Sequence, residues 1–160
     1  MRRGFAGLLL LFGLAACASA PKRDYSPVVA RFFLESADGQ GGLATLPQSG
    51  VQIAVSVKPV ITEFDVVNVE VARVELGECL MFQLTAAAAR DLYRLTTTNQ
   101  GRRLVLVLNG EALGARRIER PFEDGTVLVF VEKPDAVLPE LAADLRKTSA
   151  EIQRAAAKKS

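Results

Sequence analysis

Short apolar segments with a period of two recur along this chain and constrain its fold more than any other feature. In Val51–Val57 ("VQIAVSV"), every odd position is valine or isoleucine, and the residues between are small or polar. Because strand side chains project alternately to opposite faces, this pattern predicts a β-strand with one buried face. Strands are likewise expected at Val28–Ser36, Val66–Glu75, residues 79–84, Arg103–Leu108, residues 111–118 and Thr126–Val131.

The apolar positions also predict how these strands are placed. Leu104–Leu108 and Val127–Val131 are apolar on both faces, which is typical of central strands covered on both sides. Val51–Val57, Val66–Glu75 and residues 79–84 alternate, so each of these should bury one face only. The side chains expected on two of those buried faces are Val67, Val69 and Val71 in one strand and Leu80, Phe82 and Leu84 in the next.

The first helical period follows Thr85, whose hydroxyl can accept a backbone N–H and so cap a helix. Ala88, Leu92 and Leu95 then lie at helical spacing and predict one buried helix face. Gly101 suits the left-handed conformation that commonly ends a helix. The sequence therefore predicts a helix between Thr85 and Gly101.

Asn109-Gly110 separates two strand segments and predicts a tight hairpin turn, because both residues tolerate positive φ. A second helix is expected from about Asp135, since Pro139 is acceptable in a first turn. Its first half is expected to pack on the core and its second half to fray, with a short coiled-coil seam as the alternative. The elements together predict an α+β fold with a largely antiparallel sheet, one mid-chain helix and one C-terminal helix.

The N-terminal segment has the organisation of a secretory leader. Two arginines precede an uncharged stretch, of which Phe5–Leu14 is the most apolar part. Leu14-Ala15-Ala16-Cys17 then resembles the lipobox of bacterial lipoproteins. In that family the cysteine receives a diacylglyceryl group and becomes the new N-terminus after cleavage. The residues alone leave open an uncleaved signal anchor or an ordinary signal peptide cleaved after Ala18 or Ala20.

The lipobox resemblance implies a lipid anchor at Cys17 and an envelope location. The expected divisions are a signal peptide at 1–16, a lipidated N-terminus and tether at 17–27, an α+β domain at 28–147 and a helical or frayed tail at 148–160. Because Ala18 and Ser19 follow the cysteine without an aspartate, similarity to Gram-negative lipoproteins implies the outer membrane, with the domain facing the periplasm.

Net charge narrows the class of partner. The chain carries 20 basic and 18 acidic residues, and 18 of each remain once Arg2 and Arg3 are removed with the leader. A balanced surface does not favour the phosphate backbone of a nucleic acid. Nucleic-acid binding is therefore not expected, and the expected partners are the membrane, through the anchor, and polypeptide or another envelope protein.

A set of turn, glycine and strand residues between positions 84 and 125 has a distinctive order. It runs from an apolar-Thr step through "T-x-x-N-x-G-[KR]-x-L" and "[DN]-G" to "I-x-x-P-[apolar]-x-x-G". The matching positions are Leu84-Thr85, Thr96, Asn99, Gly101, Arg102, Leu104, Asn109-Gly110, Ile118, Pro121-Phe122 and Gly125. This order resembles the head subdomain of the first periplasmic region of SecD, the protein-export membrane protein, and the similarity covers most of Pro59–Lys147.

The resemblance to SecD implies a domain that touches unfolded or emerging polypeptide outside the inner membrane. The chain has no hydrophobic segment after residue 20, so the channel and motor activity of SecD are not implied. The sequence therefore favours a lipid-anchored periplasmic binding module. The alternative is a structural or assembly subunit of an envelope complex, docked through the C-terminal helix.

Enzyme chemistry is not expected. The chain contains no histidine, the commonest general base and metal ligand, and it shows no phosphate-binding or nucleophile motif. No catalytic residue, cofactor or metal is expected. Cys79 is expected to be a buried free thiol, with an interchain disulfide or a reactive thiol as alternatives. Arg102, Arg103, Arg116 and Arg117 flank the Asn109-Gly110 hairpin. They are either solvated strand ends or a candidate basic patch for an acidic partner or lipid headgroups.

The lipobox generates the first testable prediction. Cys17→Ser removes the only sulfur that can carry the lipid at this position, so the variant should lose its membrane attachment. We expect precursor or a soluble form in place of the anchored protein, because acyl chains supply the membrane affinity at about 0.8 kcal/mol per buried methylene. The measurement is membrane fractionation followed by carbonate extraction. A variant that stays in the membrane after extraction would favour the signal anchor.

Overall fold

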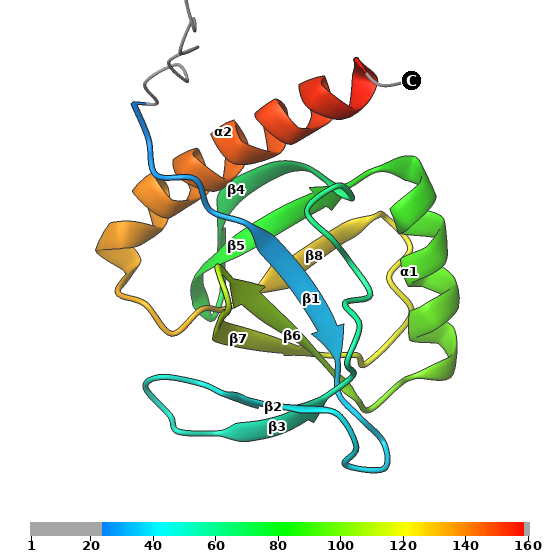
Figure 1. The fold of residues 1–160 in the computed structure, drawn as a ribbon. Coiled ribbons are helices and arrows are strands. Elements are labelled where there is room, and N and C mark those ends of the chain that lie inside the picture. Colours follow the sequence, from blue (N-terminus) through cyan, green and yellow to red (C-terminus); the bar gives the residue numbers. More distant parts are fainter. Residues whose placement is uncertain (1–23, 159–160) are drawn as a thin grey trace, which may run out of the picture.

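The alternating segments pair into antiparallel sheets, as their one-sided apolar pattern predicts (Figure 1). The protein is described by a computed structural model that covers residues 24–158. The first sheet has the order β1-β6-β7, with β1 at Ala30–Leu34, β6 at Arg103–Leu108 and β7 at Glu111–Arg117. The second has the order β4-β5-β8, with β4 at Val66–Val74, β5 at Gly77–Leu84 and β8 at Thr126–Val129. A separate hairpin joins β2 (Gly42–Thr45) to β3 (Gln52–Val55).

The helical periods form the helices α1 (Ala86–Thr98) and α2 (Leu138–Ala157), the latter preceded by the short 3-10 turn η1 (Asp135–Val137). Thr85 caps α1, because its hydroxyl accepts the N–H of Ala88 at 3.3 Å. The predicted α+β class is confirmed. Within residues 24–158, no helix is long and apolar enough to cross a membrane.

The two three-stranded sheets enclose the main core between them. Their facing strands bury Phe32 and Phe82, whose rings meet edge to face with centroids 5.1 Å apart. Leu92 from α1 and Leu145 from α2 close the sides of this core. Leu80, Phe82 and Leu84 all face it, as the alternation predicts. The core therefore draws on strands and helices from the whole length of the described chain.

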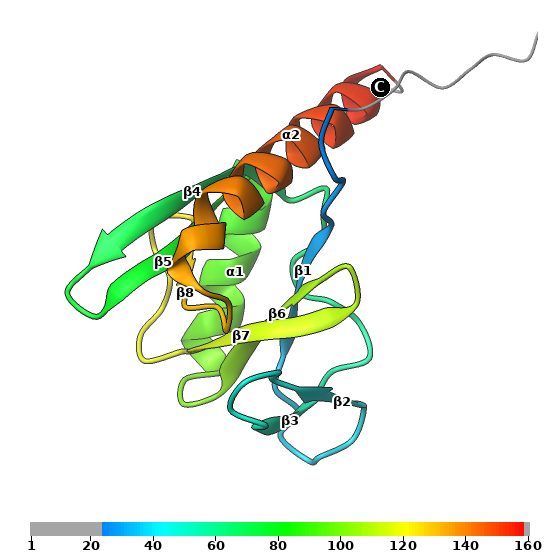
Figure 2. The same cartoon turned by 90° about the vertical axis from the view of Figure 1, so that its left-hand side faces the viewer.

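A second apolar cluster covers the outer face of the first sheet. It joins the β2–β3 hairpin to β6 and β7, and the hairpin lies beneath that sheet in Figure 2. Its buried residues are Ala44, Leu46, Ile53, Val55, Val105 and Ala112. With β1 and β7 on either side and apolar clusters on both faces, β6 is the covered central strand that its apolar pattern predicts.

The prediction for the other doubly apolar strand is wrong. β8 is an edge strand of its sheet, since β5 lies on one side and no strand is paired on its other side among the described residues. Val127 and Val129 face the core, whereas Leu128 on the opposite face is only half-buried. Apolarity on both faces therefore indicates contact on both faces, but it does not establish neighbours on both edges.

Two details of the strand pattern also differ from expectation. Val67 is exposed, because a register shift between Val66 and Asn68 turns it out while Val66 and Val69 stay buried. In the third strand Ile53 and Val55 are buried, but Val57 lies past the strand end and is 81% exposed. The sequence analysis also missed β2, a four-residue strand whose first residue is Gly42.

The second half of α2 does not fray. The helix continues to Ala157, and Thr148 and Ser149 are buried against the domain. The Gln153 side-chain amide donates to the carbonyl oxygens of Phe64 and Val66 at 2.8 and 3.2 Å. These bonds tie the helix to the segment that leads into β4, and residues 159–160 lie outside the description.

Gly101 has the expected positive φ of 86° but lies past the helix end, where Asn99 is the C-cap. Asn99 C=O accepts the N–H of Arg102 at 3.3 Å, which makes residues 99–102 a turn into β6. Gly101 N–H donates to Ile118 C=O at 2.7 Å. The glycine therefore sets the geometry by which the chain leaves α1 and joins the sheet.

We expect Gly101→Val to destabilise the protein by about 1–3 kcal/mol, because a β-branched residue is strained at positive φ. Urea unfolding of the two proteins measures the difference. Gly101→Asn is the matched control, since asparagine tolerates this region better, and it should lose less stability. Equal stability of the valine variant and the parent would show that this turn does not need a glycine.

Candidate functional site

The exposed edge of β8 faces the exposed edge of β7 across a gap. The two strands meet at one end, where Glu132 N–H donates to Leu113 C=O at 2.7 Å. From that point β7 runs toward Arg117, while β8 begins farther along at Thr126, and the strands diverge toward the side of α1 (Figure 1). We call the gap between them the wedge, and the meeting point its vertex.

The vertex depends on a residue without a side chain. A Cβ at position 114 would lie 2.2 Å from the carbonyl oxygen of Phe130 and 3.2 Å from a methyl group of Val129. Real contacts are never as short as the first of these. Gly114 therefore lets the backbones of β7 and β8 approach closely at this end of the wedge.

The main chain of β8 offers unpaired groups to the wedge. Leu84 N–H donates to Gly125 C=O, which fixes the alternation of the β5–β8 ladder. The backbone groups of Val127 and Val129 then face β5, and those of Thr126 and Leu128 face outward. Asp124 accepts the outward N–H of Thr126 at 3.1 Å. The outward groups of Leu128 have no partner in the described part of the chain.

The facing edge of β7 also directs unpaired main-chain groups toward the wedge. Ile118 N–H donates to Arg102 C=O, and Arg116 lies opposite Leu104 in the ladder with β6. The alternation therefore turns the backbone groups of Ala115 and Arg117 away from β6 and toward the side of the wedge. Two strand edges with unsatisfied main-chain groups thus border one gap.

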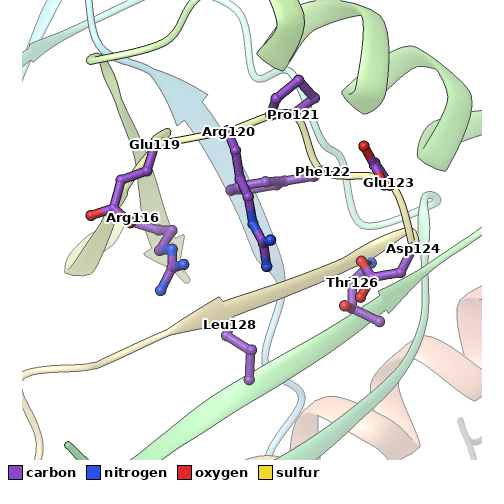
Figure 3. A pocket seen from close by; sticks show the side chains of 9 residues that line it. All are labelled: Arg116, Glu119, Arg120, Pro121, Phe122, Glu123, Asp124, Thr126 and Leu128. Carbon is purple, nitrogen blue, oxygen red and sulfur yellow. Dashed lines mark hydrogen bonds between the residues drawn. The ribbon is translucent and has the colours of Figure 1, made fainter.

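Charged and apolar side chains line the wedge, which encloses about 240 Å³ (Figure 3). β7 and β8 supply the two walls, and the loop between them closes the wide end. The lining residues are Arg116, Glu119, Arg120, Pro121, Phe122, Glu123, Asp124, Thr126 and Leu128. The wedge therefore combines strand edges, which bind main chain, with charges that can select among side chains.

An apolar hollow continues from the wedge, with Arg116 and Leu128 common to both. It runs to the tip of the β4–β5 hairpin, which projects from the domain in Figure 2. Leu76 at this tip is 86% exposed. Cys79 borders the hollow but is itself fully buried, and burial raises the pKa of its thiol. The prediction that Cys79 is a buried free thiol is confirmed.

The structure does not gather the four arginines of the candidate patch into one surface. Arg103 pairs with Glu35 at 2.5 Å, and the pKa of that carboxyl is lowered mainly by hydrogen bonding from Arg103. Arg102 donates to the Asn99 side chain and to the Glu35 carbonyl. These two guanidinium groups are therefore bound to other residues of the domain.

Arg116 and Arg117 are successive residues of β7 and project to opposite faces of the sheet. Arg117 lies opposite Arg103 in the ladder, on the face away from the main core. Of the four arginines only Arg116 lines the wedge. Its neighbour there is Arg120, which sequence analysis did not select because a single arginine in a loop has no distinguishing pattern. Cys17, the lipidation site, lies outside the described residues and stays a prediction.

Comparison with known proteins finds structural likeness only. No family model matches the chain, and no curated protein matches it significantly. A crystal structure of SecDF in a super-membrane-facing form aligns with a TM-score of 0.61 at 18% identity, over 74% of this chain and 18% of that one. SecDF from Thermus thermophilus, described as a translocon-associated membrane protein, aligns at 0.52 and 18% identity, over 78% and 20%.

A third SecDF structure, of a membrane component that enhances protein export, aligns with a TM-score of 0.58 at 18% identity. The alignment covers 75% of this chain and 62% of that one. This chain thus corresponds to about a fifth of the two longer SecDF chains. The likeness that the residues between positions 84 and 125 predict is confirmed at the level of the fold.

The close approach at the vertex yields a prediction. Gly114→Ala places a methyl group against the Phe130 carbonyl, so β7 and β8 must separate, and we expect a loss of about 1–3 kcal/mol. Gly42→Ala is the matched control, because its nearest neighbour would be a Val55 methyl group at an ordinary 3.8 Å. Urea unfolding should show a large loss for the first variant and little for the second. Equal losses would mean that the vertex tolerates a side chain.

Proposed function

We propose that this protein is a lipid-anchored envelope module that binds extended polypeptide by adding it as a strand to β8 within the wedge. The observation that carries the proposal is the outward N–H and C=O of Leu128, which have no partner among residues 24–158. An extended peptide satisfies such groups through its own backbone, and this mode is indifferent to most of the peptide's sequence. That indifference suits a protein that meets many unfolded chains.

The fold supports a role in contact with exported polypeptide. SecDF is described as enhancing protein export and as translocon-associated, and this chain shares the fold of part of it. Because the likeness covers a minor part of the longer SecDF chains, only the contact with polypeptide is proposed here. The apolar hollow beside the wedge supports the same role, since it can receive an apolar side chain of the bound segment.

The expected affinity is modest. A peptide that binds to β8 gains a few main-chain hydrogen bonds, each worth about 0.5–1.5 kcal/mol net. Binding must also offset the loss of conformational entropy when the peptide becomes ordered. This loss is larger for a flexible unbound chain than for a preformed strand. A dissociation constant on the order of 10⁻⁴ to 10⁻⁶ M follows. Weak binding allows release, which a protein that handles passing chains requires.

The proposed anchor would hold the domain at a membrane. Lipidation at Cys17 leaves a tether to residue 27, and the described chain begins at residue 24 beside α2, where Asp24 and Lys147 lie 3.6 Å apart. We propose the outer membrane, facing the periplasm, as the location. An assembly role through α2 is less favoured, because the apolar face of that helix is already packed on β4 and the main core.

Proline substitution tests strand addition directly. Leu128→Pro removes an N–H that faces the wedge and leaves the ladder with β5 intact, so binding of an extended apolar peptide should weaken about tenfold. Leu43→Pro is the matched control. Leu43 lies on β2 opposite Ala54, whose carbonyl accepts Ser36 N–H, so the Leu43 N–H also faces away from its hairpin partner. That variant should bind as the parent does.

Titrations of the full-length protein in non-ionic detergent, followed by amide NMR shifts, measure both variants, and thermal unfolding checks that each is folded. N-methylated peptides probe the same bonds with the protein unchanged. Two peptides are compared, one methylated at its odd-numbered backbone nitrogens and one at its even-numbered backbone nitrogens; these are the two phases. Only the peptide whose methylated nitrogens face β8 should lose binding, because the N–H groups of alternate residues point to opposite sides of a strand. Equal affinity in both phases, or full affinity of Leu128→Pro, would contradict strand addition.

A further inference from the structure

Two arginines from different segments point into the wedge. Arg116 belongs to β7, and Arg120 belongs to the loop that follows it. Figure 3 shows both guanidinium groups extending toward β8, with the Phe122 ring beside Arg120. Both side chains thus extend toward the strand whose edge is open, although three residues separate them in sequence.

Neither guanidinium is neutralised within the fold. The guanidinium groups of Arg116 and Arg120 make no hydrogen bond or ion pair with any residue between 24 and 158. Other arginines of the chain do: Arg31 with Glu63 at 2.6 Å, Arg73 with Glu78 at 2.5 Å and Arg103 with Glu35 at 2.5 Å. The two wedge arginines differ from these three because no carboxylate of the described residues holds them, so their charges are available to a ligand.

Acidic side chains lie near both ends of the wedge, and none of them forms an ion pair with Arg116 or Arg120 among the described residues. In Figure 3 Glu119 lies beside Arg116 at one end, and Glu123 and Asp124 lie at the other. Asp124 is already engaged, since it accepts the N–H of Thr126. The wedge therefore has a positive centre at Arg120, with Arg116 beside it and acidic side chains near both ends. Such a pattern attracts one negative group and repels a run of them.

A carboxylate fits this centre. Guanidinium groups bind carboxylates through paired N–H donors, and such charge-assisted bonds are stronger than neutral ones. The outward N–H of Leu128 lies on the adjacent strand edge and can bond the main chain of the same ligand. A peptide added to β8 would thereby place one of its acidic groups within reach of both arginines.

We infer that the wedge selects extended segments that carry a single carboxylate among uncharged residues, held by Arg116 and Arg120. The inference rests on the proposed strand addition and names the class of segment that the site prefers. Two sources can supply the carboxylate, an Asp or Glu side chain within the segment or the free C-terminus of a chain. Main-chain bonds to β8 provide the general affinity, and the arginines add the preference.

Four variants of one apolar host peptide test the inference against full-length protein in non-ionic detergent. The first has blocked ends and a central Gln, the second a central Glu, the third three consecutive Glu residues, and the fourth a central Gln with a free C-terminal carboxylate. We expect the single-Glu or the free-carboxylate peptide to bind about tenfold more tightly than the Gln peptide. Which of the two gains affinity identifies the source. The triple-Glu peptide should bind less tightly than the single-Glu peptide.

Substitutions of arginine locate the preference. In the double variant Arg116→Gln and Arg120→Gln, the preference should fall to within about twofold while the Gln peptide binds as before. Arg117→Gln is the matched control, because it changes the same charge at the adjacent residue on the opposite face of β7 and should keep the preference. Raising the salt concentration to about 0.5 M should reduce the preference, because screening weakens exposed ion pairs.

The outcomes separate this inference from the proposed function. If the Gln, Glu and free-carboxylate peptides bind equally, the selection is overturned while strand addition stands. If the double variant loses affinity for the Gln peptide as much as for the Glu peptide, the arginines support the wedge without selecting, and the selection is again overturned. If no peptide binds the parent protein, strand addition fails and the selection fails with it.

Discussion

The meeting of β7 and β8 at Gly114 is the constraint on which the rest of the site depends. The two sheets share one core, yet their edges join only where Glu132 bonds Leu113 and where the backbone of Gly114 contacts the Phe130 carbonyl. Beyond this point the twist of each sheet carries the strands apart. An open edge beside a closed vertex follows from that geometry, and neither sheet alone would produce it.

The sequence predicts most strands and helices because their signals are local. Alternation identifies β4 and β5, Thr85 identifies the start of α1, and Asn109-Gly110 identifies a hairpin whose φ values of 48° and 90° are both positive. Neighbours in a sheet are not local. β6 and β8 have the same doubly apolar pattern, yet one is central and the other is an edge, because the partners of a strand depend on distant segments of the chain.

The candidate site was harder to predict for the same reason. The position of Arg116 beside a hairpin makes it a candidate from sequence. Its neighbour in the wedge, Arg120, comes from a loop without periodicity, and Arg102 and Arg103 are bound to Asn99 and Glu35. The exposure of Val67 depends on a β-bulge, and no residue type at this position predicts that bulge. A charged side chain is available to a ligand only if no other residue of the folded protein pairs with it. Such pairing depends on tertiary contacts, which cannot be read from the sequence.

An open strand edge usually carries a risk of aggregation, and the wedge limits that risk by its shape. β8 has only four residues, and β7 closes one end of its edge. A second folded sheet needs a longer, unobstructed edge to pair with, whereas a single extended chain needs only the strand spacing of about 4.8 Å. The negative ends of the wedge add a further barrier to strongly acidic partners. The geometry that leaves Leu128 unpaired therefore favours one unfolded segment over another copy of the protein.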